Sequence, residues 1–400
     1  HGNFIKFMES HDRDVRKNAY NAVYDAYKEL INTIASAYNY NTKTDVVSAR
    51  IRKYESARAA ALSGDNIPAE VYDNLVAEVH KNLPAMHRYV ELRKKLLGVD
   101  KLYMYDMYVP LIKLPETSVS FEEGLDIMRD ALQPLGEEYL TKMNKGIEEG
   151  WIDVYENKGK TSGAYSFGCY DSYPYILLNY TDTLKDVFTI IHEMGHSMHS
   201  RYTRDEQPYI YGSHSIFTAE VASTVNESLL MQHLLRTEDE KEMRKYLLNM
   251  HLEEFRTTLF RQTMFAEFED ITHKAIESGE TLTAEWMCQQ YEDLNAQYYG
   301  SAVEKDDVIR YEWARIPHFY NAFYVYKYAT GYSAATAISK KILTEGKPAA
   351  QDYIRFLKTG ESDHPIELLK IAGVDMSSPL PVQQAMETFN QLLDEFESLL

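Results

Sequence analysis

Five consecutive residues, His192-Glu193-Met194-Gly195-His196, have the types and the spacing that metal-assisted hydrolysis requires. In an α-helix, two histidines at positions i and i+4 project from one face and can bind the same cation. A glutamate next to the first histidine can act as general base on a water molecule that the metal activates. The motif therefore predicts a zinc hydrolase with Glu193 as its base. The alternative is a pair of histidines buried in the core.

The helix that must present these histidines is expected over residues 182–202, with Asp182 as its cap. Its apolar residues fall on one side of a helical wheel: Val187, Ile190, Ile191, Met194 and Met198. His192, His196 and His199 fall on the opposite side, with Glu193 on the flank. We expect the apolar stripe to anchor the helix while the histidines face a polar site.

Zinc needs a third protein ligand and an open fourth position. A metzincin would have glycine at position 199 and histidine at 202, but this chain has His199 and Tyr202. Three ligands from one helix cannot easily surround an ion, so His199 is expected to lie behind the ligands or to face substrate. Glu220, on a second expected helix over 216–235, would complete a His, His, Glu set. Glu227 is the alternative third ligand.

Several motifs spread over nearly the whole chain are similar to those of oligoendopeptidase F, in the thimet oligopeptidase and neurolysin clan of zinc peptidases. They lie at 162–166 (SGAYS), 174–179 (PYILLN), 192–196 (HEMGH), 216–224 (IFTAEVAST), 260–267 (FRQTMFAE) and 313–320 (WARIPHFY). The resemblance implies that His192, His196 and Glu220 bind one Zn²⁺ and that Glu193 is the catalytic base. It also implies a mainly α, zincin-like fold of the neurolysin type, with a small antiparallel sheet next to the HExxH helix.

A cluster of aromatic residues follows His318, and peptide hydrolysis needs a group that stabilises negative charge on the former carbonyl oxygen. The resemblance implies this role for His318 and for a tyrosine. Alignment with the family favours Tyr326, although the spacing of its relatives is shortened here. Helical geometry instead groups Tyr324 and Tyr328 on one face, so all three tyrosines remain candidates.

Residues 151–180 differ in composition from the rest of the chain, because Gly, Ser, Tyr and β-branched residues dominate. This composition predicts a small antiparallel sheet. An exposed sheet edge can bind an extended peptide through main-chain hydrogen bonds. Gly163, Ala164 and Tyr165 are expected to form this substrate-binding edge. The alternative is a simple hairpin with structural glycines.

Apolar residues recur at helical spacing over 14–39, 44–62, 68–97 and 121–150, and again from 182 to the end. We expect residues 1–150 to form one helical wall of a substrate channel. Residues 151–400 are expected to form the catalytic region. The start of the chain resembles the interior of its relatives, which predicts that an N-terminal segment is missing.

The composition is that of a globular enzyme, with 44% apolar residues and a formal net charge of −19. The negative charge argues against nucleic acid as a partner. No apolar run suggests a membrane span, and two cysteines without C-x-x-C spacing suggest reduced thiols, so we expect a cytoplasmic protein. The oligomeric state stays open.

Together these features predict a zinc-dependent metalloendopeptidase that cleaves internal bonds of oligopeptides. Two alternatives remain. One is an inactive peptide-binding fragment. The other is a different gluzincin such as an aminopeptidase, although no G-x-M-E-N-like segment is present.

Overall fold

A computed structural model describes residues 3–113 and 118–400, and these residues form two compact units. The first unit holds the described residues up to Gly64 together with Leu75–Lys113 and Glu253–Ala329, and the second holds the rest of the described chain. The units interleave along the sequence and do not follow the expected division near residue 150. The assignment of residues 1–150 to a channel wall stays a prediction.

The first unit is helical, and its elements are α1 (Phe4–Met8), α2 (Arg13–Glu29), α3 (Ile31–Ile51), α4 (Ala57–Ser63), most of α5 (Ala69–Lys81), α6 (Leu83–Leu97), η1 (Met104–Asp106), the π-helical η4 (Phe255–Phe260), α13 (Arg261–Glu277), α14 (Ala284–Tyr299), η5 (Ile309–Arg315) and η6 (Pro317–Tyr320).

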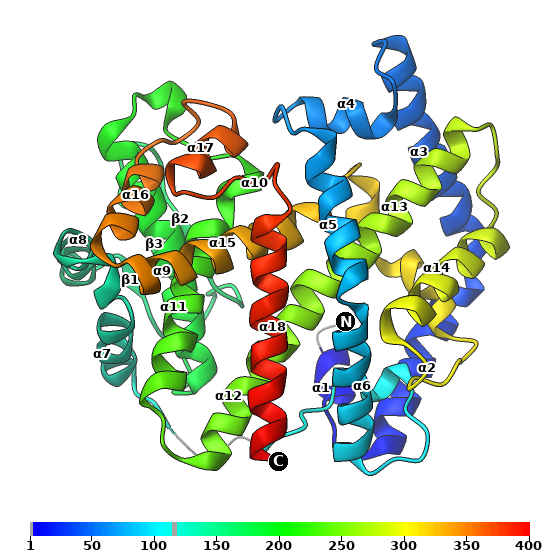
Figure 1. Cartoon of the computed structure of the whole chain (residues 1–400), viewed down its shortest axis with the longest axis horizontal. Helices are drawn as coiled ribbons and strands as arrows, with labels where there is room; N and C mark the ends of the chain where they lie inside the picture. Colours follow the sequence, from blue (N-terminus) through cyan, green and yellow to red (C-terminus); the bar gives the residue numbers. More distant parts are fainter. Residues whose placement is uncertain (1–2, 114–117) are drawn as a thin grey trace. The chain divides into compact units, whose positions relative to one another are not determined.

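The second unit contains α7 (Phe121–Ala131), η2 (Gln133–Leu135), α8 (Glu137–Glu148), β1 (Ile152–Asp153), β2 (Tyr165–Phe167), β3 (Tyr175–Leu177), α9 (Leu184–Glu206), η3 (Tyr209–Tyr211), α10 (Ile216–Ala219), α11 (Val221–Thr237), nearly all of α12 (Lys241–Glu254), most of α15 (Tyr326–Glu345), α16 (Lys347–Leu357), α17 (Pro365–Ile371) and α18 (Leu380–Leu399). The mainly α fold is as expected (Figure 1). None of the described helices is both long and apolar enough to cross a membrane.

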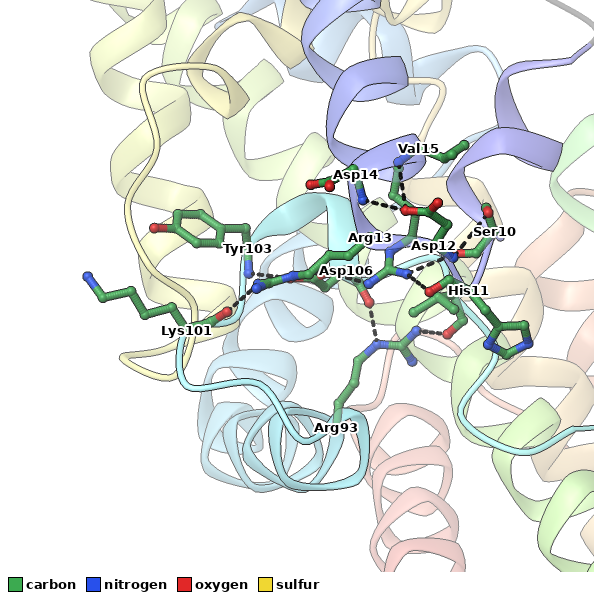
Figure 2. Close-up of polar contacts among 12 residues, drawn as sticks. Ser10, His11, Asp12, Arg13, Asp14, Val15, Arg93, Lys101, Tyr103 and Asp106 are labelled. Atoms are coloured by element: carbon green, nitrogen blue, oxygen red, sulfur yellow. Dashed lines mark hydrogen bonds and ion pairs between the residues drawn. The ribbon is translucent and has the colours of Figure 1, made fainter.

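A buried carboxylate joins distant segments of the first unit. Asp106 is fully buried and accepts hydrogen bonds from Arg13 Nη2 at 2.8 Å and Arg16 Nη2 at 2.6 Å. Arg93 Nε donates to the Asp106 backbone carbonyl at 3.0 Å (Figure 2). A buried charge is tolerated when cations and hydrogen bonds surround it. This network fixes η1 against α2 and α6.

The helix expected over 14–39 is wrong in its boundaries, because the chain breaks at Leu30 between α2 and α3. The two helices then have different main partners: α2 packs mainly on α1 and η5, whereas α3 packs mainly on α4, α13 and α14. Conversely, α3 continues through the polar stretch that was expected to end it. The hydroxyls of Thr42 and Thr44 donate hydrogen bonds to helix carbonyls one turn earlier, at 3.0 and 2.9 Å. These residues therefore do not break the helix.

The small sheet of the second unit is mixed, and the expectation of a wholly antiparallel sheet is wrong for one of its two pairings. Its strand order is β1-β3-β2, with β3 antiparallel to β2 and parallel to β1. The reason is that β2, which reverses the chain direction between β1 and β3, lies at the edge rather than in the centre. The sheet packs beside α9, where the sequence places it (Figure 1).

The predicted apolar face of α9 is confirmed, since all five of its residues are 0% exposed. The cap differs from the expected one. Thr183 Oγ1 accepts from the Asp186 N–H, and the Asp186 carboxylate accepts from the Thr183 N–H, which forms a capping box. Asp182 lies one residue earlier with φ 59°, outside the helix. The helix also extends to Glu206, beyond the expected end.

Helices α9 and α11 pack side by side (Figure 1). A Cβ atom at Gly195 would lie 2.6 Å from Ser223 Cα and 2.7 Å from the Ala222 carbonyl oxygen, both of them backbone atoms of α11. Only glycine therefore permits this approach. Asn226 on α11 adds a hydrogen bond to the Ile191 carbonyl at 3.2 Å. The glycine inside the histidine motif thus has a packing function that sequence reasoning missed.

We expect Gly195→Ala to push α9 and α11 apart. Such overpacking costs about 1–3 kcal/mol of unfolding free energy. It should also weaken metal binding, because α9 and the start of α11 carry the candidate ligands. Urea denaturation and zinc titration measure the two effects. Gly331→Ala in α15 is the matched control, because a Cβ there meets no described heavy atom within 4 Å apart from the backbone of its own helix. Equal losses in both variants would contradict this account.

A second prediction concerns His251 on α12, which is 3% exposed and whose pKa burial lowers to about 4. Below about pH 6.5 the unfolded chain protonates this histidine while the folded chain does not. Burial of the neutral histidine therefore carries no pH-dependent cost above about pH 6.5. As the pH falls from there towards 4, protonation of the unfolded chain lowers the free energy of unfolding. The slope is at most about 1.4 kcal/mol per pH unit.

In His251→Gln this slope should be absent. Urea denaturation of both proteins at pH 8, 6 and 5 should therefore show the wild type losing more stability than the variant. Parallel curves for the two proteins would contradict the prediction.

Candidate metal centre

Three predicted ligands meet in the second unit. His192 Nε2 lies 3.2 Å from His196 Nε2 and 3.4 Å from Glu220 Oε2, and His196 Nε2 lies 3.3 Å from the same oxygen. Tetrahedral zinc with bonds of about 2.0–2.1 Å would place its ligand atoms about 3.3 Å apart. The three nitrogen and oxygen atoms therefore fit a zinc ion in both chemistry and spacing. In the described part of the chain, these three residues form a group of His and Glu side chains whose ligand atoms lie close enough together to hold a metal ion.

Glu220 lies at a break between α10 and α11, so the single helix expected over 216–235 is interrupted at the candidate ligand. Ser223 Oγ donates to Glu220 Oε2 at 3.1 Å and fixes the carboxylate. Burial alone would raise the pKa of Glu220, but the hydrogen bond from His196 and the charges of both histidines lower it to about 2. The carboxylate is thus ionised, as a metal ligand must be.

Glu227, the alternative third ligand, lies on the other side of His192. Its Oε2 atom is 3.3 Å from His192 Nδ1, whereas Nε2 faces Glu220. Metal-binding histidines commonly donate their second ring N–H to such a carboxylate, which fixes the ring orientation. Glu220 and Glu227 are about two helical turns apart, and this spacing could have indicated that both reach the same histidine.

The ionisation of His192 reflects this arrangement. Burial lowers its pKa, but the hydrogen bond and charge of Glu227, together with the charges of Glu220 and Glu193, raise it to about 9. Without metal, both ring nitrogens of His192 are therefore protonated at neutral pH, and the ring is positively charged. A metal ion that binds Nε2 must displace a proton from the ring, which makes metal affinity depend on pH.

Glu193 is 7% exposed, and burial raises the pKa of its carboxyl group. A backbone N–H of Ser166 on β2 hydrogen-bonds to it. The Ser166 hydroxyl also lies 2.7 Å from the Ser197 hydroxyl of α9. The candidate base and the edge strand are thus held together by direct contacts, a connection that the spacing of the sequence does not reveal.

The structure places β2 at the sheet edge, and Tyr165 is its first residue, 47% exposed. Gly163 and Ala164 precede the strand rather than belonging to it. Gly163 has φ 88°, and its carbonyl accepts a hydrogen bond from Asn179 Nδ2 at 2.8 Å. A role in peptide binding stays a prediction for these three residues.

His199 is 1% exposed, so its side chain does not face open solvent as a substrate-facing residue would. Its ring stacks on His214 with centroids 4.1 Å apart and an interplanar angle of 11°. Burial lowers the pKa of both histidines, that of His214 to about 4. His214 was not identified from the sequence, since no spacing links it to the motif.

The residues predicted to stabilise the oxyanion belong to the first unit. The rings of His318 and Tyr324 are stacked at 5.7 Å, and the Tyr328 hydroxyl lies 3.4 Å from His318 Nε2. Tyr326, favoured by alignment, has a fully buried side chain. Geometry therefore groups Tyr324 and Tyr328 with His318, and the roles of all four residues stay predictions.

We expect Glu227→Gln to weaken zinc binding about 10- to 100-fold, because an amide accepts more weakly from His192 Nδ1 than a carboxylate does. Competition with a chelating dye measures the affinity. Glu242→Gln on α12 is the control, since the Glu242 carboxylate forms a surface ion pair with Lys245. Unchanged affinity in Glu227→Gln would show that this carboxylate does not support the ligand.

Comparison with known proteins gives matches over the whole chain. The sequence profile of peptidase family M3 matches residues 6–388. Oligopeptidase PepF of Bacillus subtilis is 54% identical over 400 residues, which are 100% of this chain and 60% of that protein. Group B oligopeptidase PepB of Streptococcus agalactiae is 45% identical over 400 residues, or 66% of its length. This chain therefore spans about two thirds or less of these relatives.

Solved structures show the same fold. Oligoendopeptidase-F from Enterococcus faecium superposes with a TM-score of 0.83 at 41% identity, over 100% of this chain and 66% of the other. A protein from Chlamydophila abortus gives a TM-score of 0.94 at 42% identity, over 100% and 67%. These matches confirm the resemblance and the helical zincin-like fold expected from the motifs. The chain belongs to peptidase family M3.

Proposed function

We propose that this chain carries the catalytic centre of a zinc-dependent endopeptidase that hydrolyses internal bonds of oligopeptides. The observation that carries the proposal is the triangle of His192, His196 and Glu220 atoms, with Glu193 on the same helix. The names of the relatives, oligopeptidase and oligoendopeptidase F, support the substrate class. The acidic composition and the presence of only two cysteines, without C-x-x-C spacing, support a cytoplasmic location.

Zinc at this site would polarise the peptide carbonyl and lower the pKa of a water molecule towards about 7. Glu193 accepts the proton of the attacking water as the new C–O bond forms. It then donates this proton to the amine nitrogen as the C–N bond breaks. Burial raises the pKa of the Glu193 carboxyl, which suits a group that must both accept and release a proton near neutral pH.

We assign oxyanion stabilisation to His318 with Tyr324 or Tyr328, and Tyr326 remains the candidate from alignment. A tyrosine hydroxyl and an imidazole N–H can both donate to a developing negative charge. The proximity of the Tyr328 hydroxyl to His318 Nε2 supports a pair that acts together.

The β2 edge is the proposed peptide-binding strand. Ser166 connects it to Glu193, so a peptide paired with β2 would run past the base. Main-chain pairing tolerates many side chains. Tyr165 and Phe167 are 47% and 69% exposed and offer apolar surface to alternate residues of such a peptide.

The test compares Glu193→Gln with Glu220→Gln. Glu193→Gln should keep bound zinc in metal analysis, while turnover of an N-terminally acetylated, internally quenched peptide falls at least about 100-fold. Glu220→Gln should lose the metal, because it removes a charged ligand.

Mass spectrometry of the products separates the alternatives. Internal cuts in the blocked peptide support an endopeptidase, and cleavage of free but not blocked peptides supports an aminopeptidase. Zinc binding without any cleavage supports a peptide-binding protein. Full activity in Glu193→Gln would overturn the assignment of the base.

A further inference from the structure

Phe323 has an unusual backbone conformation for a large apolar residue. Its φ is 53°, in the left-handed region, which costs non-glycine residues about 1–3 kcal/mol. Among the described residues, the other non-glycine positions with positive φ are polar and exposed: Lys53, Asn66 and Asp182. Phe323 is instead 2% exposed. The surrounding structure must therefore hold it in this conformation.

Glu269 on α13 provides one restraint. Its Oε1 atom accepts the Phe323 backbone N–H at 2.6 Å, and the side chain is 0% exposed. Its Oε2 atom has no hydrogen-bond partner in the described part of the chain. Burial raises the pKa of this carboxyl well above its ordinary value, because it disfavours the charged form. An apolar residue would be less costly to bury here.

His273, one turn further along α13, provides the second restraint. Its ring centroid is 4.6 Å from that of Phe323. The ring is itself fixed, because Nδ1 hydrogen-bonds to the Glu269 carbonyl at 2.8 Å and Nε2 lies 3.4 Å from Asp45 Oδ2. Helix α13 thus restrains both the N–H and the ring of Phe323.

The left-handed residue lies between the two elements that carry the candidate oxyanion donors. His318 is on η6, and Tyr328 is in the first turn of α15. The chain reorients between them, so that the Tyr328 hydroxyl approaches His318 Nε2 and Tyr324 stacks on the same ring. A relaxed backbone at Phe323 would change the direction in which α15 begins.

We propose that Glu269 is a positioning residue, which holds Phe323 in its left-handed conformation and thereby aligns His318, Tyr324 and Tyr328 for catalysis. This inference rests on the proposed function, because the three side chains must act in peptide hydrolysis. Glu269 itself touches none of the reacting atoms in this account. Small misplacements of catalytic groups reduce turnover strongly.

The experiment uses Glu269→Met, which removes the acceptor at similar volume, and Glu269→Gln, which keeps a carbonyl oxygen for the Phe323 N–H. Asn39→Leu is the matched control, because Asn39 Oδ1 accepts the buried Leu282 N–H at 3.1 Å in the same unit. Zinc content, thermal stability, kcat and KM are measured for each variant with the quenched peptide.

Glu269→Met should lower kcat about 10- to 100-fold with zinc content and KM nearly unchanged. Glu269→Gln should restore kcat close to the wild-type value. Asn39→Leu should lose stability but retain kcat. If Glu269→Met does not fold, Phe323→Ala tests the other restraint, since it removes the ring that packs on His273, and it should also lower kcat.

Full kcat in a folded Glu269→Met or Phe323→Ala protein would overturn the proposal, and so would an equal loss of kcat in Asn39→Leu. These failures are distinct from a failure of the proposed function. If the proposed function itself were wrong, the wild type would show no cleavage that depends on Glu193. The inference about Glu269 would then fail together with the proposed function.

Discussion

The contact between α9 and α11 determines the geometry of the candidate metal centre. At Gly195 the two backbones lie so close that a single added methyl group would meet Ser223 Cα at 2.6 Å. Ser223 lies one turn after Glu220 and one turn before Glu227. The packing therefore places Glu220 beside the Nε2 atoms of both histidines and Glu227 beside His192 Nδ1. A wider separation of the helices would remove both contacts.

The same packing distributes charge within the centre. Burial disfavours every charged group there, yet mutual attraction lowers the pKa of Glu220 and raises that of His192. Glu193 is different, because burial dominates and raises the pKa of its carboxyl. Neighbouring carboxyl groups are thus suited to different chemistry: one to hold a cation and the other to transfer a proton. The two residues are both glutamates, so the difference between their pKa shifts comes from their environments.

Two buried acids in the first unit show contrasting solutions to the cost of burial. Asp106 is surrounded by arginines and joins three elements as an ion-paired centre. At Glu269, burial instead raises the pKa of the carboxyl, and Oε1 accepts the backbone N–H of the left-handed Phe323. The first arrangement fixes a fold. The second leaves one oxygen without a hydrogen-bond partner among the described residues, and such an unfavourable feature is typical of sites where function constrains structure.

Local patterns in the sequence were sufficient for the HExxH helix, the apolar face of α9, the candidate ligand Glu220 and the position of the sheet. Each depends on helical periodicity or on residue chemistry within a short segment. The break at Leu30, the mixed sheet and the cap at Thr183 depend on which partner each element meets, and neighbouring residues do not specify that. The division of the chain into two units that interleave along the sequence also depends on which elements pack together.

The sequence by itself determined which side chains could bind zinc and transfer protons, because these properties belong to residue types at fixed helical spacing. Only the tertiary structure decided that Glu227 reaches the far nitrogen of His192, that His199 is buried against His214 and that Glu269 restrains Phe323. These are contacts between residues distant along the chain, and they are set by how closely helices can pack.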